Sequence, residues 1–362
     1  MTALLASRAF DTRDADPTHA RARTGRTALR GGGVRGDGDE RTPAMCWTGL
    51  DELDAAVTLA SFRAWAAPLI AAGDPNVLEY LADRLAELVG DDERAAHEVL
   101  GWVRDTAGDE IWLVLEGLKR APAIHQPAVA DALARVGLDP AIDAEHRTAI
   151  FAALDTQRQL APDILDGLAG AAMADDPGEA GWVAARTVGR VMIEEQHRGG
   201  EPAPYVERLL AIGARSPDAQ VRSVALEMPM HVDAPVDGAA SSRLAAIITG
   251  DPDPEVRKTA IHDLSLAVDR DQALQAYENA FRSEHDVCVR WALFRFTARL
   301  AGARALSVMA RMALLDPRFA SDLEIFQRIY ASGVVDFERV WQSLPDDDPH
   351  HCLDVEGEGE ES

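Results

Sequence analysis

Cysteines, aromatic residues, basic residues and long apolar runs are all scarce in this chain of 362 residues. Its three cysteines, Cys46, Cys288 and Cys352, are odd in number and widely separated. This usage predicts no disulfide framework and agrees with a reducing compartment. No apolar run reaches the about 18 residues of a membrane-spanning helix, and no secretory signal is recognisable. We therefore expect a soluble, cytoplasmic protein.

Basic residues are outnumbered, with 36 Lys and Arg against 61 Asp and Glu, and the formal net charge is −25. Residues 1–41 contribute +2 and residues 345–362 contribute −8, which leaves −19 for the body between them. A body of this charge repels nucleic-acid phosphates and anionic membranes. We expect a protein or peptide partner of basic or mixed charge, with no nucleic acid and no membrane. The oligomeric state stays open.

Motifs of catalysis and cofactor binding are missing as well. The sequence contains no Gly-rich phosphate loop, nucleophile elbow or paired-cysteine site. The run His350-His351-Cys352 has the residue types of a soft-metal chelator, but a structural zinc site needs ligands that converge from a fold. A solvated tail is the favoured interpretation of this run. We expect no catalytic residue, no metal and no cofactor.

The sequence does contain a signal that recurs every 33 to 38 residues. An Asp opens seven of the eight copies, and Ala180 takes its place in the other. A usually aliphatic residue stands three positions later, and Arg or an apolar residue stands four positions later. The clearest copies begin at Asp218, Asp253 and Asp286, and weaker ones begin at Asp74, Asp109, Asp143 and Asp322. A fixed period in this range is typical of stacked helical repeats.

Each copy is predicted to hold two helices joined by a short turn. In the copy that opens at Asp253, apolar residues recur with helical spacing at Val256, Ala260, Ile261 and Leu264. The Asp stands at the expected N-cap, where its carboxylate can accept from the unpaired amides of the first turn. Neither helix of such a pair can bury its apolar stripe alone, so neighbouring pairs must stack.

These residues resemble the HEAT-repeat family, whose second helix opens with Asp, a Val-Arg pair and then a small residue. The matches are Asp218, Val221, Arg222 and Ala225; Asp253, Val256, Arg257 and Ala260; and Asp286, Val289 and Arg290. The resemblance implies an all-α, right-handed α-solenoid of about eight HEAT-like hairpins. It also implies that the second helices line the concave face. A ladder between adjacent repeats is implied for Asp218, Arg222, Asp253, Arg257, Asp286 and Arg290.

Composition divides the chain into three parts. Residues 1–44 are rich in Arg and Gly, have few large apolar side chains and are expected to be disordered; the alternative is that translation begins at Met45. Residues 45–344 form the HEAT-like body. Residues 345–362 form an acidic tail that is expected to be disordered.

The concave face supplies the candidate binding residues. Trp291 follows the Val-Arg pair and is expected to leave the core stripe toward this face, where an exposed aromatic residue is a typical binding anchor. The same offsets place Lys258, His262, Arg295 and Glu227 along the face. The alternative for Trp291 is that it covers the seam between two repeats.

The leading hypothesis is a non-enzymatic scaffold or adaptor that binds a protein or peptide on its concave face. The second is an acidic neutraliser of a basic protein, such as an immunity protein for a toxin. The third is a HEAT-like enzyme, either a DNA glycosylase or a lyase. A glycosylase must hold a duplex in a basic groove, which the net charge of −25 opposes.

Overall fold

The computed structural model describes residues 57–352, except for residues 107, 156, 158, 233–235, 335 and 346–348. This part of the chain is helical, with no strand and one isolated bridge between Val236 and Ala267. The prediction of an all-α fold is confirmed for these residues, and residues 1–44 lie outside them. Every helix within the described ranges is too short or too polar to cross a bilayer.

The chain divides into two compact units between Ile164 and Leu165, and each is described by itself. In the N-terminal unit, helices pack as the neighbouring pairs α4 with α5, α6 with α7, and α8 with α9. Their bounds are α4 Leu59–Ala72, α5 Pro75–Val89, α6 Glu93–Trp102, α7 Asp109–Arg120, α8 Pro127–Gly137 and α9 Ala144–Ala153. Two short 3-10 turns, η1 Val103–Asp105 and η2 Pro122–His125, connect them.

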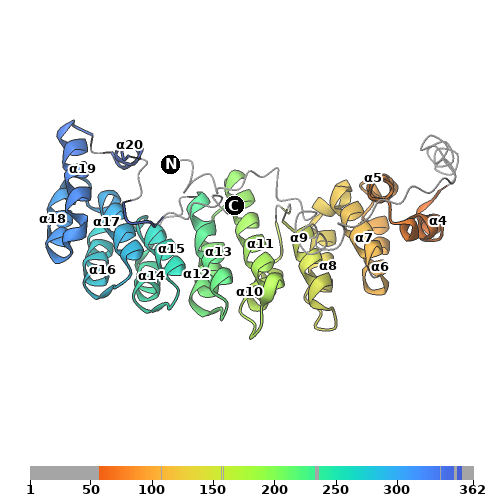
Figure 1. The fold of residues 1–362 in the computed structure, drawn as a ribbon. Coiled ribbons are helices and arrows are strands. Elements are labelled where there is room, and N and C mark those ends of the chain that lie inside the picture. Colours follow the sequence, from red (N-terminus) through yellow and green to blue (C-terminus); the bar gives the residue numbers. More distant parts are fainter. Residues whose placement is uncertain are drawn as a thin grey trace, which may run out of the picture. The chain divides into compact units, whose positions relative to one another are not determined.

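The C-terminal unit continues the pairing with α12 and α13, α14 and α15, α16 and α17, and α18 and α19 (Figure 1). The first helices of these pairs pack on one another in chain order, and α11, α13, α15 and α17 do the same. The bounds are α10 Pro162–Ala172, α11 Gly178–His197, α12 Ala203–Arg215, α13 Ala219–Glu227, α14 Gly238–Gly250, α15 Pro254–Leu264, α16 Arg270–Ser283, α17 Val287–Ala301, α18 Ala305–Leu315, α19 Ala320–Ala331 and α20 Phe337–Gln342. Three 3-10 turns, η3 Met228–Val232, η4 Gly302–Arg304 and η5 Pro317–Phe319, complete the unit.

The apolar stripes predicted from the sequence form the core of each pair. All four stripe residues of α15, from Val256 to Leu264, are fully buried. The corresponding residues of α17, Val289, Leu293, Phe294 and Thr297, are fully buried too. Burial of one such aliphatic side chain contributes about 1.5–3 kcal/mol, so the stripes supply most of the stabilisation.

The motif Asp is the N-cap of the second helix in five of the seven copies. Each of these carboxylates accepts from one or two backbone amides of the first turn, and the five are Asp74, Asp143, Asp218, Asp253 and Asp286. The prediction is wrong for two copies. Asp109 is already the first residue of α7, whose N-cap is Gly108. Asp322 lies inside α19, because the turn η5 starts the helix at Ala320.

The motif Arg fastens two turns together. Arg222 donates to the carbonyl oxygens of Ser216 and Pro217, both at 3.1 Å, in the turn before its own helix. It also donates to both carboxylate oxygens of Asp251, at 2.8 and 2.9 Å, in the turn of the next pair. One buried guanidinium thus satisfies carbonyls in its own pair and a charge in the neighbouring pair.

The same arrangement recurs along the C-terminal unit. Arg257 donates to the carbonyl oxygens of Asp251 and Pro252 and pairs with Glu284 at 2.8 Å. Arg290 pairs with Asp316 at 2.8 Å. The partner acids also order their own turns: Asp251 accepts from the amide of Asp253 at 2.9 Å, and Glu284 from that of Asp286 at 2.9 Å.

The ladder between repeats therefore exists with a different acidic partner from the one expected. The resemblance pairs the motif Arg with motif Asp residues. The carboxylates of Asp253 and Asp286 instead accept from backbone amides in the first turns of α15 and α17, as helix caps. The acids that meet Arg222 and Arg257 stand two residues before those caps. In the N-terminal unit, Arg147 makes the same contact to its own turn, through the carbonyls of Gly137 and Ile142.

The partner assignment predicts the outcome of a double-mutant cycle. Arg257→Ala and Glu284→Ala should each lower the free energy of unfolding by about 3 kcal/mol, because each leaves a poorly solvated charge unpaired. Their coupling energy, measured by chemical denaturation, should exceed about 1 kcal/mol.

The matched control combines Arg257→Ala with Asp253→Ala. Loss of the cap alone should cost about 1 kcal/mol. The two effects should add to within about 0.5 kcal/mol, since the two side chains serve different partners. Strong coupling to Asp253 with none to Glu284 would contradict the assignment.

Candidate functional site

Three neighbouring second helices present one face with a common register. On α13, α15 and α17, the residues two, five and nine positions after the N-cap Asp share this face. They are Gln220, Ser223 and Glu227; Glu255, Lys258 and His262; and Cys288, Trp291 and Arg295. We call this the second-helix face. All five predicted binding residues occupy these positions.

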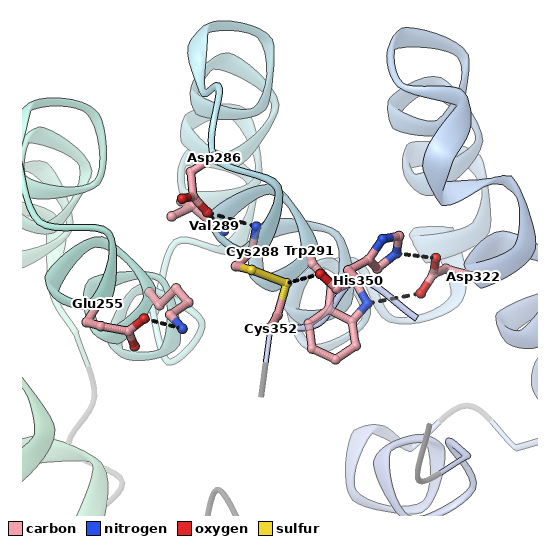
Figure 2. Close-up of a disulfide and its surroundings, with 9 residues drawn as sticks. Glu255, Asp286, Cys288, Val289, Trp291, Asp322, His350 and Cys352 are labelled. Atoms are coloured by element: carbon pink, nitrogen blue, oxygen red, sulfur yellow. Dashed lines mark hydrogen bonds and ion pairs between the residues drawn. A yellow bond between two sulfur atoms is a disulfide. The ribbon is translucent and has the colours of Figure 1, made fainter. Parts of the chain in front are cut away.

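Trp291, however, is not an exposed anchor, because only 6% of the residue is accessible. Its indole Nε1 donates to the Asp322 carboxylate at 3.0 Å, which joins α17 to α19 (Figure 2). The ring also makes an edge contact with His350, with 5.8 Å between centroids. The prediction of an exposed Trp291 is wrong, and the alternative that it covers the seam between two repeats describes the structure.

Arg295 is covered to the same extent, with 6% accessible. Its guanidinium lies over the Trp291 ring at 4.2 Å from the centroid and over the Trp341 ring at 4.7 Å. Cations over indole rings are favourable, and more so when they are withdrawn from water. Trp341 belongs to α20, so the chain's own C-terminal end makes one wall of this site.

The other three candidates remain partly accessible. Lys258 pairs with Glu255 at 2.6 Å within α15. His262 stacks on Phe296 of α17, with 4.7 Å between ring centroids. Glu227 is half-buried at the end of α13. These residues occupy the part of the second-helix face next to the covered part.

The cover consists of α20 and residues 349–352, which we call the C-terminal segment. Phe337 and Trp341 of α20 pack on Phe296, with centroids 6.1 and 5.2 Å apart. His350 lies over Trp291 and Phe319, and its Nε2 is 2.9 Å from the Asp322 carboxylate. A pocket of about 10 Å³, room for about one water molecule, is lined by Trp291, Arg295 and Asp322 together with Leu344, Pro345 and Pro349.

A disulfide between Cys288 and Cys352 joins the end of this segment to the first turn of α17, across 64 residues of sequence (Figure 2). Two sequence-based interpretations are therefore corrected. The widely separated cysteines do form a bond, because the fold returns the end of the chain to α17. Residues 349–352 are docked rather than disordered, whereas residues 346–348 and 353–362 of the predicted tail lie outside the described residues.

Two residues of the run His350-His351-Cys352, which has the residue types of a metal chelator, are engaged in other contacts. Cys352 is in the disulfide and His350 meets Asp322. In the described part of the chain, no group of three or more His, Cys, Asp or Glu residues is arranged to hold a metal ion. The functional residues that sequence reasoning missed are Asp322, Trp341, His350 and the two cysteines. In the structure, the 3-10 turn η5 directly ahead of the helix that holds Asp322 sets this copy apart from the other six.

Comparison with known proteins does not identify the chain: no family model matches it, and no curated protein matches it significantly.

Burial of Trp291 predicts a structural effect of its removal. Trp291→Ala should lower the free energy of unfolding by about 3 kcal/mol or more, since it leaves a cavity and removes the donor to one oxygen of the Asp322 carboxylate. Thermal and chemical denaturation of the full chain measure this, with Trp182→Ala on half-buried Trp182 as the control. Unchanged stability would contradict the buried position of Trp291.

Burial of His262 predicts a pH effect. Desolvation, together with the charge of Arg299 and the nearby His231, lowers the pKa of His262 from 6.5 to about 4. Below pH 6.5, His262 binds a proton in the unfolded chain, whereas in the folded chain it stays neutral until about pH 4. The free energy of unfolding therefore decreases as the pH falls from 6.5 to about 4.

The loss attributable to His262 should reach about 2 kcal/mol by about pH 5. His262→Gln should remove it from the pH profile of unfolding, whereas His125→Gln, at an exposed residue, should leave it. Identical profiles for the His262 variant and the wild type would contradict the assignment.

Proposed function

We propose that the chain is a non-enzymatic, HEAT-like α-solenoid that binds a protein or peptide along its second-helix face. The proposal includes right-handed stacking of about eight hairpins and a cytoplasmic location. The recurring pairs of helices and the repeated Arg contacts between turns support the stacking. Solenoids of this kind typically use such a face for extended partners.

One observation carries the proposal: the second-helix face already holds a peptide, the chain's own C-terminal segment. Ring contacts to Phe296, a cation between two indoles at Arg295 and a carboxylate at Asp322 fix this segment. In protein interfaces, aromatic rings typically supply most of the buried area, and charged groups fix the position of the bound segment along the face. A face that binds a segment in cis has the chemistry to bind one in trans.

The adjoining part of the face has a mixed character. Gln220 and Glu255 are exposed, and Ser223 and Lys258 are half-buried. Glu227, Glu255 and Lys258 put charges of both signs on this part of the face, within a chain of net charge −25. This composition favours a partner of basic or mixed charge, because complementary charges raise the rate of association and select against wrong partners.

A photo-crosslinking amino acid at position 223 tests the binding face. Expressed in the native host, the Ser223 variant should crosslink to one partner, identified by mass spectrometry. The matched control places the same amino acid at exposed Ser242 of α14, on a first helix. Equal crosslinking of the partner from both positions, or no crosslinking from position 223, would contradict the proposal.

The net charge of −25 supports a second candidate, an acidic neutraliser of a basic protein. Once the partner has been identified, the salt dependence of its association rate distinguishes the two functions. For a neutraliser, the association rate should fall by more than about tenfold between about 0.05 and 0.5 M salt, because screening removes long-range steering. For a scaffold anchored by rings, the rate should change far less.

A further inference from the structure

We propose that the Cys288–Cys352 disulfide is a redox latch that holds the C-terminal segment over Trp291 and Arg295. Reduction of the latch uncovers this end of the second-helix face for a partner. The opening rests on the geometry and on the proposed cytoplasmic location, and the use of the opened face rests on the proposed binding function.

The disulfide connects the end of the C-terminal segment to the helix that this segment covers, α17. Cys288 lies two residues after the N-cap of α17 and one helical turn before Trp291, on the same face (Figure 2). Cys352 is the last described residue of the segment. Both cysteines are half-buried, so a small dithiol has access to the sulfur atoms.

Few other contacts hold residues 349–352. His350 meets Asp322 at 2.9 Å and lies beside two rings, at 5.8 and 4.9 Å between centroids. The sequence that follows Cys352 carries five further acids, Asp354, Glu356, Glu358, Glu360 and Glu361, on a chain that is already strongly acidic. Like-charge repulsion therefore opposes docking, and the covalent bond offsets it.

The bond does not close the core of the unit. It fastens the C-terminal segment, which follows α19, so the apolar stripes of α15, α17 and α19 stay buried when it opens. A disulfide of this kind in a cytoplasmic protein is typically transient rather than structural. Opening should free the segment, α20 included, and leave the other helices of the unit folded.

The chemistry is a two-electron thiol–disulfide exchange with a dithiol as the reductant. A dithiol thiolate attacks one cystine sulfur, so the S–S bond breaks, a mixed disulfide forms and the other cysteine leaves as a thiolate. The second dithiol sulfur then attacks the mixed disulfide. The products are two cysteine thiols, after protonation by water, and the oxidised dithiol.

Hydrogen exchange of the full chain, with and without dithiothreitol, tests the latch. Mass spectrometry first establishes the Cys288–Cys352 bond in the oxidised sample and its absence in the reduced one. Amides of residues 337–352 should exchange at least about tenfold faster after reduction, with the other helices unchanged. Cys352→Ser should exchange fast under both conditions, and Cys46→Ser should behave as the wild type.

Hydroxyl-radical footprinting without dithiothreitol then compares Trp291 oxidation in the Cys352→Ser variant and the wild type. Faster oxidation of Trp291 in the variant supports the opening. Equal exchange and equal footprints, with the thiols shown to be free, would overturn the latch, as would an oxidised sample that contains no bond.

A labelled peptide of residues 336–352 with Cys352→Ser probes the use of the opened face. It should bind the Cys352→Ser protein at least about tenfold more tightly than the oxidised protein, because the tethered segment no longer blocks the site completely. Faster exchange without peptide binding would leave the latch standing and count against the proposed function at this end of the face. Equal peptide binding to both proteins would support the face and reject the latch.

Discussion

In the C-terminal unit, the stacking of successive pairs depends on three motif arginines, Arg222, Arg257 and Arg290, each of which reaches an acid in the turn of the next pair. At Arg222 and Arg257 the guanidinium meets backbone carbonyls on one side and a carboxylate on the other. Each of these groups would be costly to bury alone, and each is satisfied by the others. Apolar burial holds the pairs together, and this contact fixes how one pair meets the next.

Much of the helical framework could be predicted from the sequence, because its signals are local. Helical spacing in residues such as Val256 and Leu264 reports burial directly, and five motif Asp residues cap the helices they precede. The prediction failed at Asp322, where a preceding 3-10 turn takes over the start of the helix and releases the carboxylate for Trp291. A short turn of this kind moves the start of the helix relative to the motif Asp, while the motif in the sequence stays the same.

The candidate site was predicted only in its register, since its covering comes from residues far away in sequence. Trp291, Arg295 and His262 do share one face, yet no local pattern indicates that α20 and His350 return to cover the first two. The same holds for the partners of the arginines: Asp251 and Glu284 lie in turns 29 and 27 residues away. Contacts of this range are decided by packing between pairs, which no local pattern encodes.

The arginine contacts also bear on how such a chain changes length in evolution. Asp251, Glu284 and Asp316 occupy equivalent places, and each meets the arginine of the preceding pair. Excision of residues 251–283 would bring Glu284 to the place of Asp251, opposite Arg222, and duplication of the same stretch would add one matched pair of charges. Gain or loss of a whole hairpin thus leaves no arginine without an acid, whereas an insertion of a few residues within a turn would.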